Sequence, residues 1–531
     1  MNDARSRIAA SLRDGFAALN AGDARRAGEH CRAALALDRS HPEAHFLVGL
    51  VAFEMNDLKT AASAFGSVTK LSPGHAAAWA QLARTFIRLG QPAQAEQALA
   101  KAVAANPGDP AVMDLIGVVS SLLGDQAAAK QWYVRAVANA PDRPAYAVNL
   151  ATALTFLGEV DGAKETLTEL LKKHPDIAQA QWQLSSVATA SARARADLLM
   201  AKAEKAPDAS SRAFLAYAAG KEFEDCEAWE AAFTAFETGA RAKRSSVSYD
   251  EQAEAAMFAA LETTFTEEWA AAAQKGFDDP SPIFVVGQPR TGTTLIERII
   301  ASHSMVESAG ELQQFGLSVR RLSKGAFPDR WSPDAIRASG EVDPEALGRE
   351  YLRASAPMRK DAPRFVDKLP GNYLHIPLIL AALPQARIVH LTRNPLDSCF
   401  ASYKQLFAEA YYHSYDLLEM ARHHLRYLEL MRRWRELFPG RFLDISYEAT
   451  VADAEPHARA LIDFLGLPWE DRCLAFHEQK TAVATASAVQ VREKPHTRSV
   501  GRWRRYEKQL APMRETLFRA GAVGESGDSQ M

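Results

Sequence analysis

The sequence predicts two kinds of structure in one chain: an α-helical solenoid in its first half and an α/β domain with a mainly parallel sheet in its second half. Two observations carry this prediction. Glycine or asparagine recurs every 34 residues between positions 22 and 158. From residue 281 onward, short apolar runs alternate with helical stretches, as in consecutive strand–helix units. The length of 531 residues also exceeds one ordinary hydrophobic core and favours two or three domains.

The 34-residue spacing comes with a fixed pattern of residue types. Alanine follows each turn by five residues, glycine or alanine precedes it by seven, and proline closes most units. Small residues let two antiparallel helices approach closely, and proline ends the second helix. This pattern resembles the tetratricopeptide repeat, with about five units over residues 8–177. The turn positions are Gly22, Asn56, Gly90, Gly124 and Gly158.

The repeat pattern weakens after residue 177. We interpret residues 178–275 as irregular helical units that cap the solenoid and connect it to the next domain, although residues 214–244 still have the pattern of a helical pair. Solenoids of this kind commonly bind a peptide or a protein on their concave face. A scaffold or a dimerisation arm fits the repeats equally well.

Composition narrows the classes of partner. The net charge of −3 gives no reason to expect a nucleic acid or a membrane as partner, so an anion site has to come from local clusters. The four cysteines form no C-x-x-C pair, the N-terminus has no apolar signal region, and no apolar run approaches 18 residues. We therefore expect a cytoplasmic protein without integral membrane association, ending in a flexible tail at 521–531.

A glycine-rich loop, "GQPRTGTT" at 287–294, follows the first apolar run of the second half. It nearly matches the phosphate-binding pattern G-x-x-x-x-G-K-[ST], but Thr293 stands in place of the lysine. Its backbone N–H groups, the two threonine hydroxyls and the helix start would still hold a phosphate. The run "RIVHLT" ends in Arg393 and not in a magnesium-binding aspartate. Two such sites fit a nucleotide phosphorylated at both its 5′ and 3′ positions and bound by arginines without a metal.

At this point residues 281–520 resemble the sulfotransferases that use 3′-phosphoadenosine-5′-phosphosulfate (PAPS) as donor, a likeness carried by "PRTGTT" and "RIVHLTRNPLDS". Among these enzymes, the chain is most similar to bacterial tetratricopeptide-repeat sulfotransferases and to the protein-tyrosine sulfotransferase branch. The resemblance implies a P-loop-like sheet domain and a donor site with no metal. It implies Glu311 as catalytic base and Lys368 as the group that stabilises the transferring sulfuryl group. Arg290, with Lys368, is suited to the charge that accumulates on the bridging oxygen of the leaving group. The implied donor-binding residues are Arg290, Thr291, Gly292, Thr293, Thr294, Arg393, Ser398, Tyr447, Ser487 and Lys494.

The sequence departs from the family pattern at one donor-binding position. The family places a serine eight residues after the 3′-phosphate arginine, and here that residue is Ala401. Ser398 and Ser402 flank it, and Ser398 lies one helical turn earlier on the same face. Near the end of the chain, Arg492 is an alternative to Lys494 within the segment that covers the nucleotide in this family.

Several alternatives remain open from the sequence. Residues 491–508 hold seven lysines and arginines against two glutamates, which favours a basic lid over an anionic cofactor ahead of a nucleic-acid patch. We interpret His413, His423 and His424 as helix-surface or core residues and not as ligands. The acceptor is a peptide tyrosine, a saccharide or a lipid-linked glycan selected by the repeats. The competing functions are a degenerate sulfotransferase-like scaffold and, with less support, a P-loop nucleotide phosphotransferase.

Overall fold

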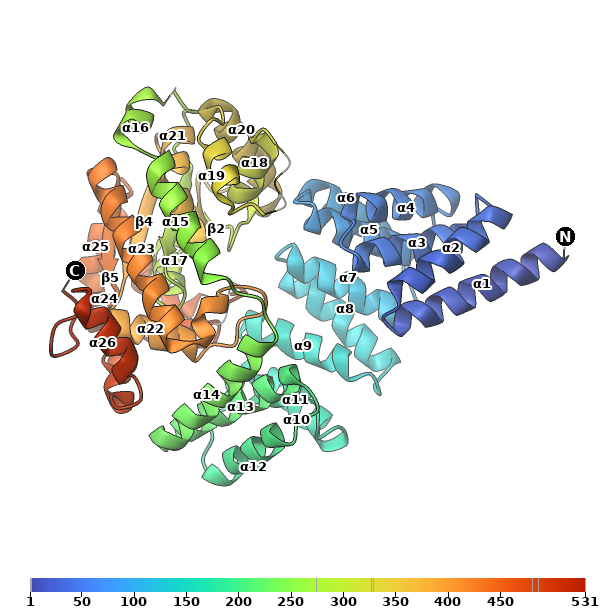
Figure 1. Cartoon of the computed structure of the whole chain (residues 1–531), viewed down its shortest axis with the longest axis horizontal. Coiled ribbons are helices and arrows are strands. Elements are labelled where there is room, and N and C mark those ends of the chain that lie inside the picture. Colours follow the sequence, from blue (N-terminus) through green and yellow to red (C-terminus); the bar gives the residue numbers. More distant parts are fainter. Residues whose placement is uncertain are drawn as a thin grey trace. The chain divides into compact units, whose positions relative to one another are not determined.

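The computed structural model describes residues 2–273, 275–325, 327, 329–479, 481–485 and 487–530 (Figure 1). The chain forms two compact units, one ending at Ala153 and the other beginning at Leu154, and each is described by itself. Among the helices in these ranges, none combines the length and the apolar character needed to cross a bilayer.

The first unit consists of antiparallel helix pairs, and the helices of a pair, such as α3 and α4 or α7 and α8, lie side by side (Figure 1). Its helices are α1 (Asn2–Asn20), α2 (Ala24–Leu37), α3 (Pro42–Glu54), α4 (Leu58–Leu71), α5 (Ala76–Arg88), α6 (Pro92–Ala104), α7 (Pro110–Leu122), α8 (Gln126–Asn139) and the first part of α9 (Pro144–Leu157).

The repeated residues explain this arrangement. Every turn position predicted from the sequence has a left-handed backbone, with φ between +59° at Asn56 and +92° at Gly124, a conformation that glycine and asparagine tolerate best. The next residue is often an aspartate that caps the second helix, as when Asp57 accepts a hydrogen bond of 3.1 Å from the backbone N–H of Thr60. A Cβ on Gly117 would lie 2.6 Å from the ring of Tyr133, so this close helix contact requires glycine.

The second unit begins with helices that extend the repeat. They are the end of α9, α10 (Val160–Lys173), α11 (Ala178–Val187), α12 (Arg193–Glu204), α13 (Ala209–Asp225), α14 (Trp229–Ser245), α15 (Glu251–Thr264) and α16 (Glu267–Ala272). The pair α13 and α14 has a left-handed turn residue at Glu227 (φ +56°), with Gly220 seven residues before it and buried Ala232 five residues after it. The repeat geometry therefore returns without the turn glycine by which the sequence pattern was recognised.

The rest of the second unit is built on a parallel sheet. Its strands are β1 (Pro282–Gly287), β2 (Val306–Ser308), β3 (Arg364–Asp367), β4 (Arg387–Thr392) and β5 (Phe442–Ser446), in the spatial order β2-β3-β1-β4-β5. All neighbouring strands are parallel, and the register pairs Gly287 with Leu391 and Thr392 with Ser446. The fold class predicted from the sequence, a helical solenoid followed by an α/β domain with a parallel sheet, is confirmed.

Helices cover both faces of the sheet. They are α17 (Thr293–Ala301), α18 (Gln314–Leu322), α19 (Pro333–Ser339), α20 (Pro344–Ser355), α21 (Ile376–Ala382), α22 (Pro395–Tyr403), α23 (Leu417–Leu437), α24 (Tyr447–Ala452), α25 (Ala454–Phe464) and α26 (Ala511–Arg519). Alternate residues of β1 pack into different hydrophobic cores. Phe284 packs into a core with residues of α15, α20 and α23, whereas Ile283 packs into a core with residues of α17 and α25. A strand buried on both faces has to be apolar throughout, which is why "PIFVV" shows no alternation.

The helices before the sheet share a core with it. Phe233 of α14 stacks on Phe400 of α22 with ring centroids 6.4 Å apart, and the Tyr217 hydroxyl donates a hydrogen bond of 2.9 Å to the carbonyl of Tyr403. These residues belong to one continuous buried cluster that also includes Trp503 and Leu517 of the last segment. Residues 209–245 are therefore packed into the sheet domain through a common core.

Candidate active site

The carboxyl ends of the strands bring the predicted site residues to one edge of the sheet. Glu311 follows β2, Lys368 follows β3, the glycine-rich loop follows β1, Arg393 follows β4 and Tyr447 follows β5. In parallel open sheets this edge is where ligands bind. Residues that lie far apart in the sequence therefore lie next to one another at the carboxyl ends of the strands, in the spatial order of the strands.

The loop after β1 holds Arg290 in a strained conformation. Arg290 has φ +66°, in the left-handed region that is uncommon for residues other than glycine, and its guanidinium donates hydrogen bonds to Ser487 Oγ at 2.5 Å and Gln490 Oε1 at 3.1 Å. Burial, and then the nearby Arg393, lower the pKa of Arg290 to about 10. No carboxylate within the described ranges lies at ion-pair distance from this guanidinium, which suits an anion as its missing partner.

Arg393 lies beside this loop. Its guanidinium donates hydrogen bonds to the carbonyls of Arg290 at 2.6 Å and Ser499 at 2.8 Å, and it lies 4.6 Å above the ring centroid of Tyr447. The same ring covers Gly292, where φ is +105° and a Cβ would come within 2.6 Å of Tyr447 Cδ2. Arg290, Gly292, Arg393 and Tyr447 therefore form one cluster.

The loop threonines are enclosed at the start of α17. Thr291 donates a hydrogen bond of 2.7 Å to the Gln288 carbonyl and so fixes the turn, while Thr293 and Thr294 are each 5% exposed. The Thr294 hydroxyl lies 3.5 Å from that of Thr485. Because the first N–H groups of a helix have no partner within it, this end of α17 remains a site for an anion.

The late segment, by which we mean residues 481–485 and 487–492, packs against this loop. It supplies Ser487 and Gln490 to Arg290, and Thr485 to Thr294. Sequence reasoning identified Ser487 but missed Gln490, which stands two residues before the Arg492 already considered. Lys494 is exposed, and among the described residues it makes no hydrogen bond or ion pair with this loop.

The two serines near Ala401 differ in their surroundings. Ser402 donates a hydrogen bond of 3.2 Å to the carbonyl of Pro289 and therefore supports the loop. Ser398 is fully buried, and its hydroxyl has no hydrogen-bond partner in the part of the chain that the structure describes. A buried hydroxyl without a partner is costly, which makes Ser398 the better candidate for a ligand contact.

Glu311 and Lys368 meet at the other end of the edge. The Lys368 ammonium is 1% exposed and donates a hydrogen bond to Glu311 Oε1, while the Glu311 side chain is 41% exposed. A second carboxylate, Glu297 of α17, lies 3.9 Å from the same ammonium, and burial raises the pKa of Glu297. Glu297 could not be recognised from the sequence, because it stands among the apolar residues of a helix that follows the loop.

Tyr411 is a further residue that sequence reasoning missed. It has φ +57°, and burial together with the Glu311 carboxylate raises the pKa of its phenol. Its ring lies 6.2 Å from that of His413. A tyrosine with a left-handed backbone, whose phenol is influenced by the Glu311 carboxylate, is thus a further candidate residue at this site.

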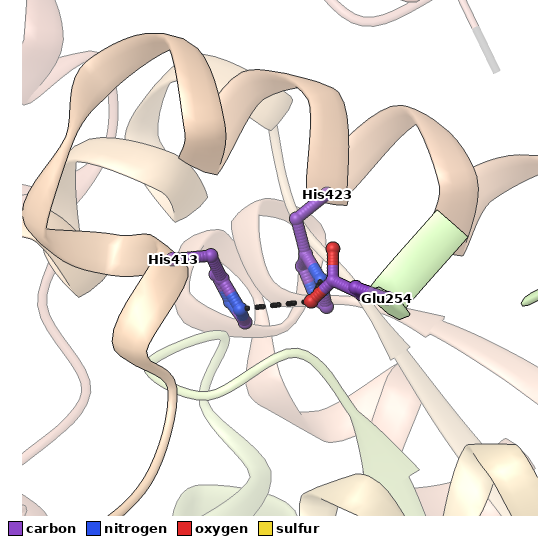
Figure 2. A group of neighbouring side chains, drawn as sticks. All are labelled: Glu254, His413 and His423. Atoms are coloured by element: carbon purple, nitrogen blue, oxygen red, sulfur yellow. Dashed lines mark hydrogen bonds and ion pairs between the residues drawn. The ribbon is translucent and has the colours of Figure 1, made fainter. Parts of the chain in front are cut away.

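Figure 2 shows a cluster formed by Glu254, His413 and His423. The imidazole rings are stacked with centroids 3.5 Å apart and planes 11° apart, and their Nδ1 atoms lie 3.3 Å and 3.0 Å from Glu254 Oε1. A metal bound to an imidazole nitrogen lies in the ring plane, and two stacked, nearly parallel rings share no such position. We therefore describe a hydrogen-bonded cluster in which both Nδ1–H groups donate to the carboxylate.

This cluster supports the loop. His423 Nε2 lies 3.3 Å from the side-chain amide of Gln288, the residue that follows β1. Burial, and then His423, lower the pKa of His413 to about 4, so His413 is neutral at physiological pH. His413, His423 and His424 are all buried, which selects the core interpretation over the helix-surface one.

The basic stretch 491–508 is partly neutralised by carboxylates of the chain itself. Arg498 pairs with Glu493, Arg502 lies 3.2 Å from Glu224, and Arg504 lies 2.9 Å from Asp528. Asp397 accepts hydrogen bonds from the backbone N–H groups of Gly501 at 2.6 Å and Trp503 at 2.9 Å. Most of this stretch is thus held by internal contacts, and its surplus of charge is smaller than its composition indicates.

Comparison with known proteins finds matches for both parts of the chain. A sulfotransferase family model matches residues 282–471, and tetratricopeptide repeat models match residues 15–76, 52–117 and 147–176. An uncharacterized protein of Aquifex aeolicus is 40% identical over 253 residues, which is 46% of this chain and 33% of that protein. A protein-tyrosine sulfotransferase of Drosophila melanogaster is 23% identical over 210 residues, covering 37% of this chain and 40% of that enzyme.

The chain therefore spans a third of the length of the first relative and two fifths of the length of the second. The solved sulfotransferase domain of the Synechococcus PCC 7002 olefin synthase is 19% identical and is covered to 98%, with 46% of this chain aligned at a TM-score of 0.32. That superposition is too loose to add to the fold described above. The family matches, together with the strand-end arrangement of the site, lead to one conclusion: this chain joins tetratricopeptide repeats to a domain of the sulfotransferase family.

Proposed function

We propose that this chain transfers a sulfuryl group from PAPS to a hydroxyl of an acceptor, either a peptide tyrosine or a saccharide. The observation that supports this most strongly is the division of the sheet edge. At one end lie two guanidiniums for which the described residues supply no carboxylate partner, and at the other lies a buried lysine paired with a half-exposed glutamate. A donor with two phosphates and an acceptor hydroxyl require these two kinds of surroundings.

The donor site needs no metal in this proposal. Arg290, Gly292 and the hydroxyls of Thr293 and Thr294 would hold the 5′-phosphate, with Thr291 shaping the turn. Arg393 and Ser398 would hold the 3′-phosphate, and Tyr447 would lie beside the nucleotide. Two arginines supply the positive charge that magnesium supplies in nucleoside triphosphate enzymes.

PAPS supplies an activated sulfuryl group, and the chain supplies a base and compensating charge. Glu311 accepts the proton of the acceptor hydroxyl as its oxygen attacks the sulfur. Lys368 and Arg290 stabilise the charge that develops on the departing phosphate oxygen, and the product nucleotide keeps both of its phosphates. A positioned carboxylate base is worth about 10²–10⁴-fold in rate for this kind of proton transfer.

The donor is tested by thermal stabilisation. Adenosine-3′,5′-bisphosphate should stabilise the chain in the presence of EDTA, by about 2.7 kcal/mol at a hundredfold excess over Kd. Mg-ATP should stabilise it less. Equal or greater stabilisation by Mg-ATP would favour a phosphotransferase, and no stabilisation by either nucleotide would favour the scaffold.

The proposal includes acceptor selection by the repeats. A cut near Ser281 would remove α13 and α14, whose residues share a core with α22, and would leave Phe400 and Tyr403 without that cover. A chain that begins near Pro141 keeps α9 whole and is the better truncation. Once its folding is verified by circular dichroism and melting, it should bind nucleotide normally and lose kcat/KM for the native acceptor. An undiminished kcat/KM would assign the repeats another role.

A further inference from the structure

The turn at the end of α9 differs from the matching turns of the earlier repeats. The residue two positions before the turn glycine is Asn20, Arg88 or exposed Leu122 in those units, and here it is Phe156. Its ring packs against Val483, Ala488 and Val491 of the late segment. This repeat turn therefore carries an apolar contact with the part of the chain that covers the candidate donor site.

The backbone of the turn makes a second contact. The last carbonyls of a helix have no partner within it, and the Phe156 carbonyl accepts hydrogen bonds from the Val483 backbone N–H at 2.8 Å and from Arg492 Nη2 at 3.0 Å. Both donors belong to the late segment. The end of this helix is thus completed by a segment more than 300 positions further along the chain.

Arg492 links the turn to the start of the late segment. Besides Phe156, its guanidinium donates to the carbonyls of Thr481 at 3.1 Å and Gln479 at 3.3 Å. Three backbone carbonyls thus accept hydrogen bonds from this one guanidinium. Arg492 therefore holds the backbone around it.

The same short segment holds Arg290 on its other side. Ser487 and Gln490 both accept from the Arg290 guanidinium, within five residues of Arg492. If the late segment is already ordered before the nucleotide binds, binding does not have to overcome the loss of conformational entropy that ordering a mobile segment would require. We propose that the turn Phe156–Gly158, acting through Arg492, positions the late segment against Arg290 and so sets the affinity for the donor nucleotide; this inference rests on the proposed function.

Gly158 gives a sharp test with a matched control. Gly158 has φ +82° and Gly124 has φ +92°, so alanine meets the same left-handed backbone strain at both positions. A Cβ at Gly158 would lie 2.5 Å from Arg492 Cζ, whereas a Cβ at Gly124 meets nothing within 4 Å. The difference between Gly158→Ala and Gly124→Ala therefore isolates the contact with Arg492.

The experiment uses the full chain and three readouts: the melting temperature, Kd for adenosine-3′,5′-bisphosphate, and hydrogen exchange of the late segment. We expect both variants to lower the melting temperature, and only Gly158→Ala to raise Kd, by about tenfold, and to speed exchange. Its kcat at saturating donor should stay near that of Gly124→Ala. A general loss of structure would change all of these quantities in both variants.

Arg492→Gln provides a second route that leaves the turn backbone intact. It should raise Kd to a similar degree, and Gly158→Ala should add little to it, because both changes remove one link. Equal Kd values for Gly158→Ala, Arg492→Gln and Gly124→Ala would overturn the inference. A wild-type chain that binds no bisphosphate would overturn the proposed function and with it the donor role of the turn, while the exchange comparison would still report whether the turn anchors the segment.

Discussion

Two regions at the carboxyl ends of the strands, one after β1 and β4 and the other after β2 and β3, differ in how their charged side chains are paired. At the β1–β4 end, the guanidiniums of Arg290 and Arg393 lie close together and bond only to carbonyl, hydroxyl and amide groups within the described ranges. At the β3 end, the Lys368 ammonium has carboxylates on two sides, Glu311 and Glu297. The positive charges of the first region lack a counter-charge until an anion binds, whereas the ammonium of the second region already has carboxylate partners.

This difference assigns binding and chemistry to separate residues. Two neighbouring cations gain when an anion relieves their repulsion, so a change at Arg393, which has no role in the proposed chemical step, should act on nucleotide affinity. A carboxylate held by a buried ammonium is positioned for proton transfer, so changes at Glu311 should act on rate. Each prediction below tests whether this separation holds.

The largest effect is expected for Glu311→Gln. Glutamine keeps the size and the hydrogen bond to Lys368 but accepts no proton at neutral pH, so turnover should fall by roughly 10²-fold or more while nucleotide Kd stays within a few-fold. Single-turnover rates and Kd are measured together. Exposed Glu341 lies outside this edge, and Glu341→Gln is the control. Normal turnover in Glu311→Gln would place the base elsewhere.

Arg393→Ala should affect nucleotide binding more than rate, which is the reverse of the effect expected for Glu311→Gln. It removes a charge-assisted contact to the 3′-phosphate, so nucleotide binding should weaken by about 1.5–3 kcal/mol, with a smaller change in rate at saturating donor. Calorimetric titration measures the loss. Arg504→Ala removes an arginine already paired with Asp528 and should leave Kd unchanged. Normal binding by Arg393→Ala would show that "TRNPLDS" is not the 3′-phosphate site.

The region around Lys368 also predicts a pH dependence of the unfolding free energy. Asp367, directly before Lys368, is fully buried, and burial raises its pKa to about 7 from 3.8. The folded chain therefore keeps a proton that the unfolded chain has lost, and this contribution is complete below pH 4 and disappears as the pH rises through 7. The slope is on the order of 1.4 kcal/mol per pH unit in that window.

Asp367→Asn removes this ionisation while still accepting the hydrogen bond of Tyr351. Melting temperatures between pH 5 and pH 8 should vary less in this variant than in the wild type. Asp361→Asn, at an exposed position, should preserve the wild-type slope. An unchanged slope in Asp367→Asn would mean that Asp367 remains ionised in the folded chain.

The smallest effects are expected for the two serines. Ser398→Ala should weaken nucleotide binding a few-fold without lowering the melting temperature, because its hydroxyl has no hydrogen-bond partner among the described residues to lose. Ser402→Ala should cost about 1 kcal/mol of unfolding free energy through its hydrogen bond to Pro289, with less effect on Kd. The reverse result would exchange their roles.

Periodic and strand-end features were predictable from the sequence. Residues such as Gly22 and Gly124 were found by their spacing, and the structure gives each a left-handed turn. The loop at 287–294 and Arg393 were found because a polar motif follows an apolar run, and the ends of adjacent parallel strands must meet. Strand β2 has three residues, which is too short for an apolar period to appear.

The remaining parts depend on contacts between distant residues. Glu254 and His423 are 169 positions apart, and nothing in either neighbourhood marks the other. The same holds for Tyr217 and Tyr403, whose contact joins the helical region to the sheet domain. The charges of residues 491–508 can be counted from the sequence, but their ion-pair partners cannot be predicted, because Glu224 and Asp528 lie outside that stretch.

The core shared by α14 and α22 has a consequence for cooperativity. Helix α22 carries Ser398 and Ser402, and its Phe400 stacks on Phe233 of α14. Opening the donor site by fraying α22 would therefore break a packed aromatic layer in a helix that lies more than 150 positions earlier in the chain. Local opening of that kind approaches the free energy of global unfolding. Amide protons of α14 and α22 should exchange as one unit, and the donor site should lose its shape only when this unit unfolds.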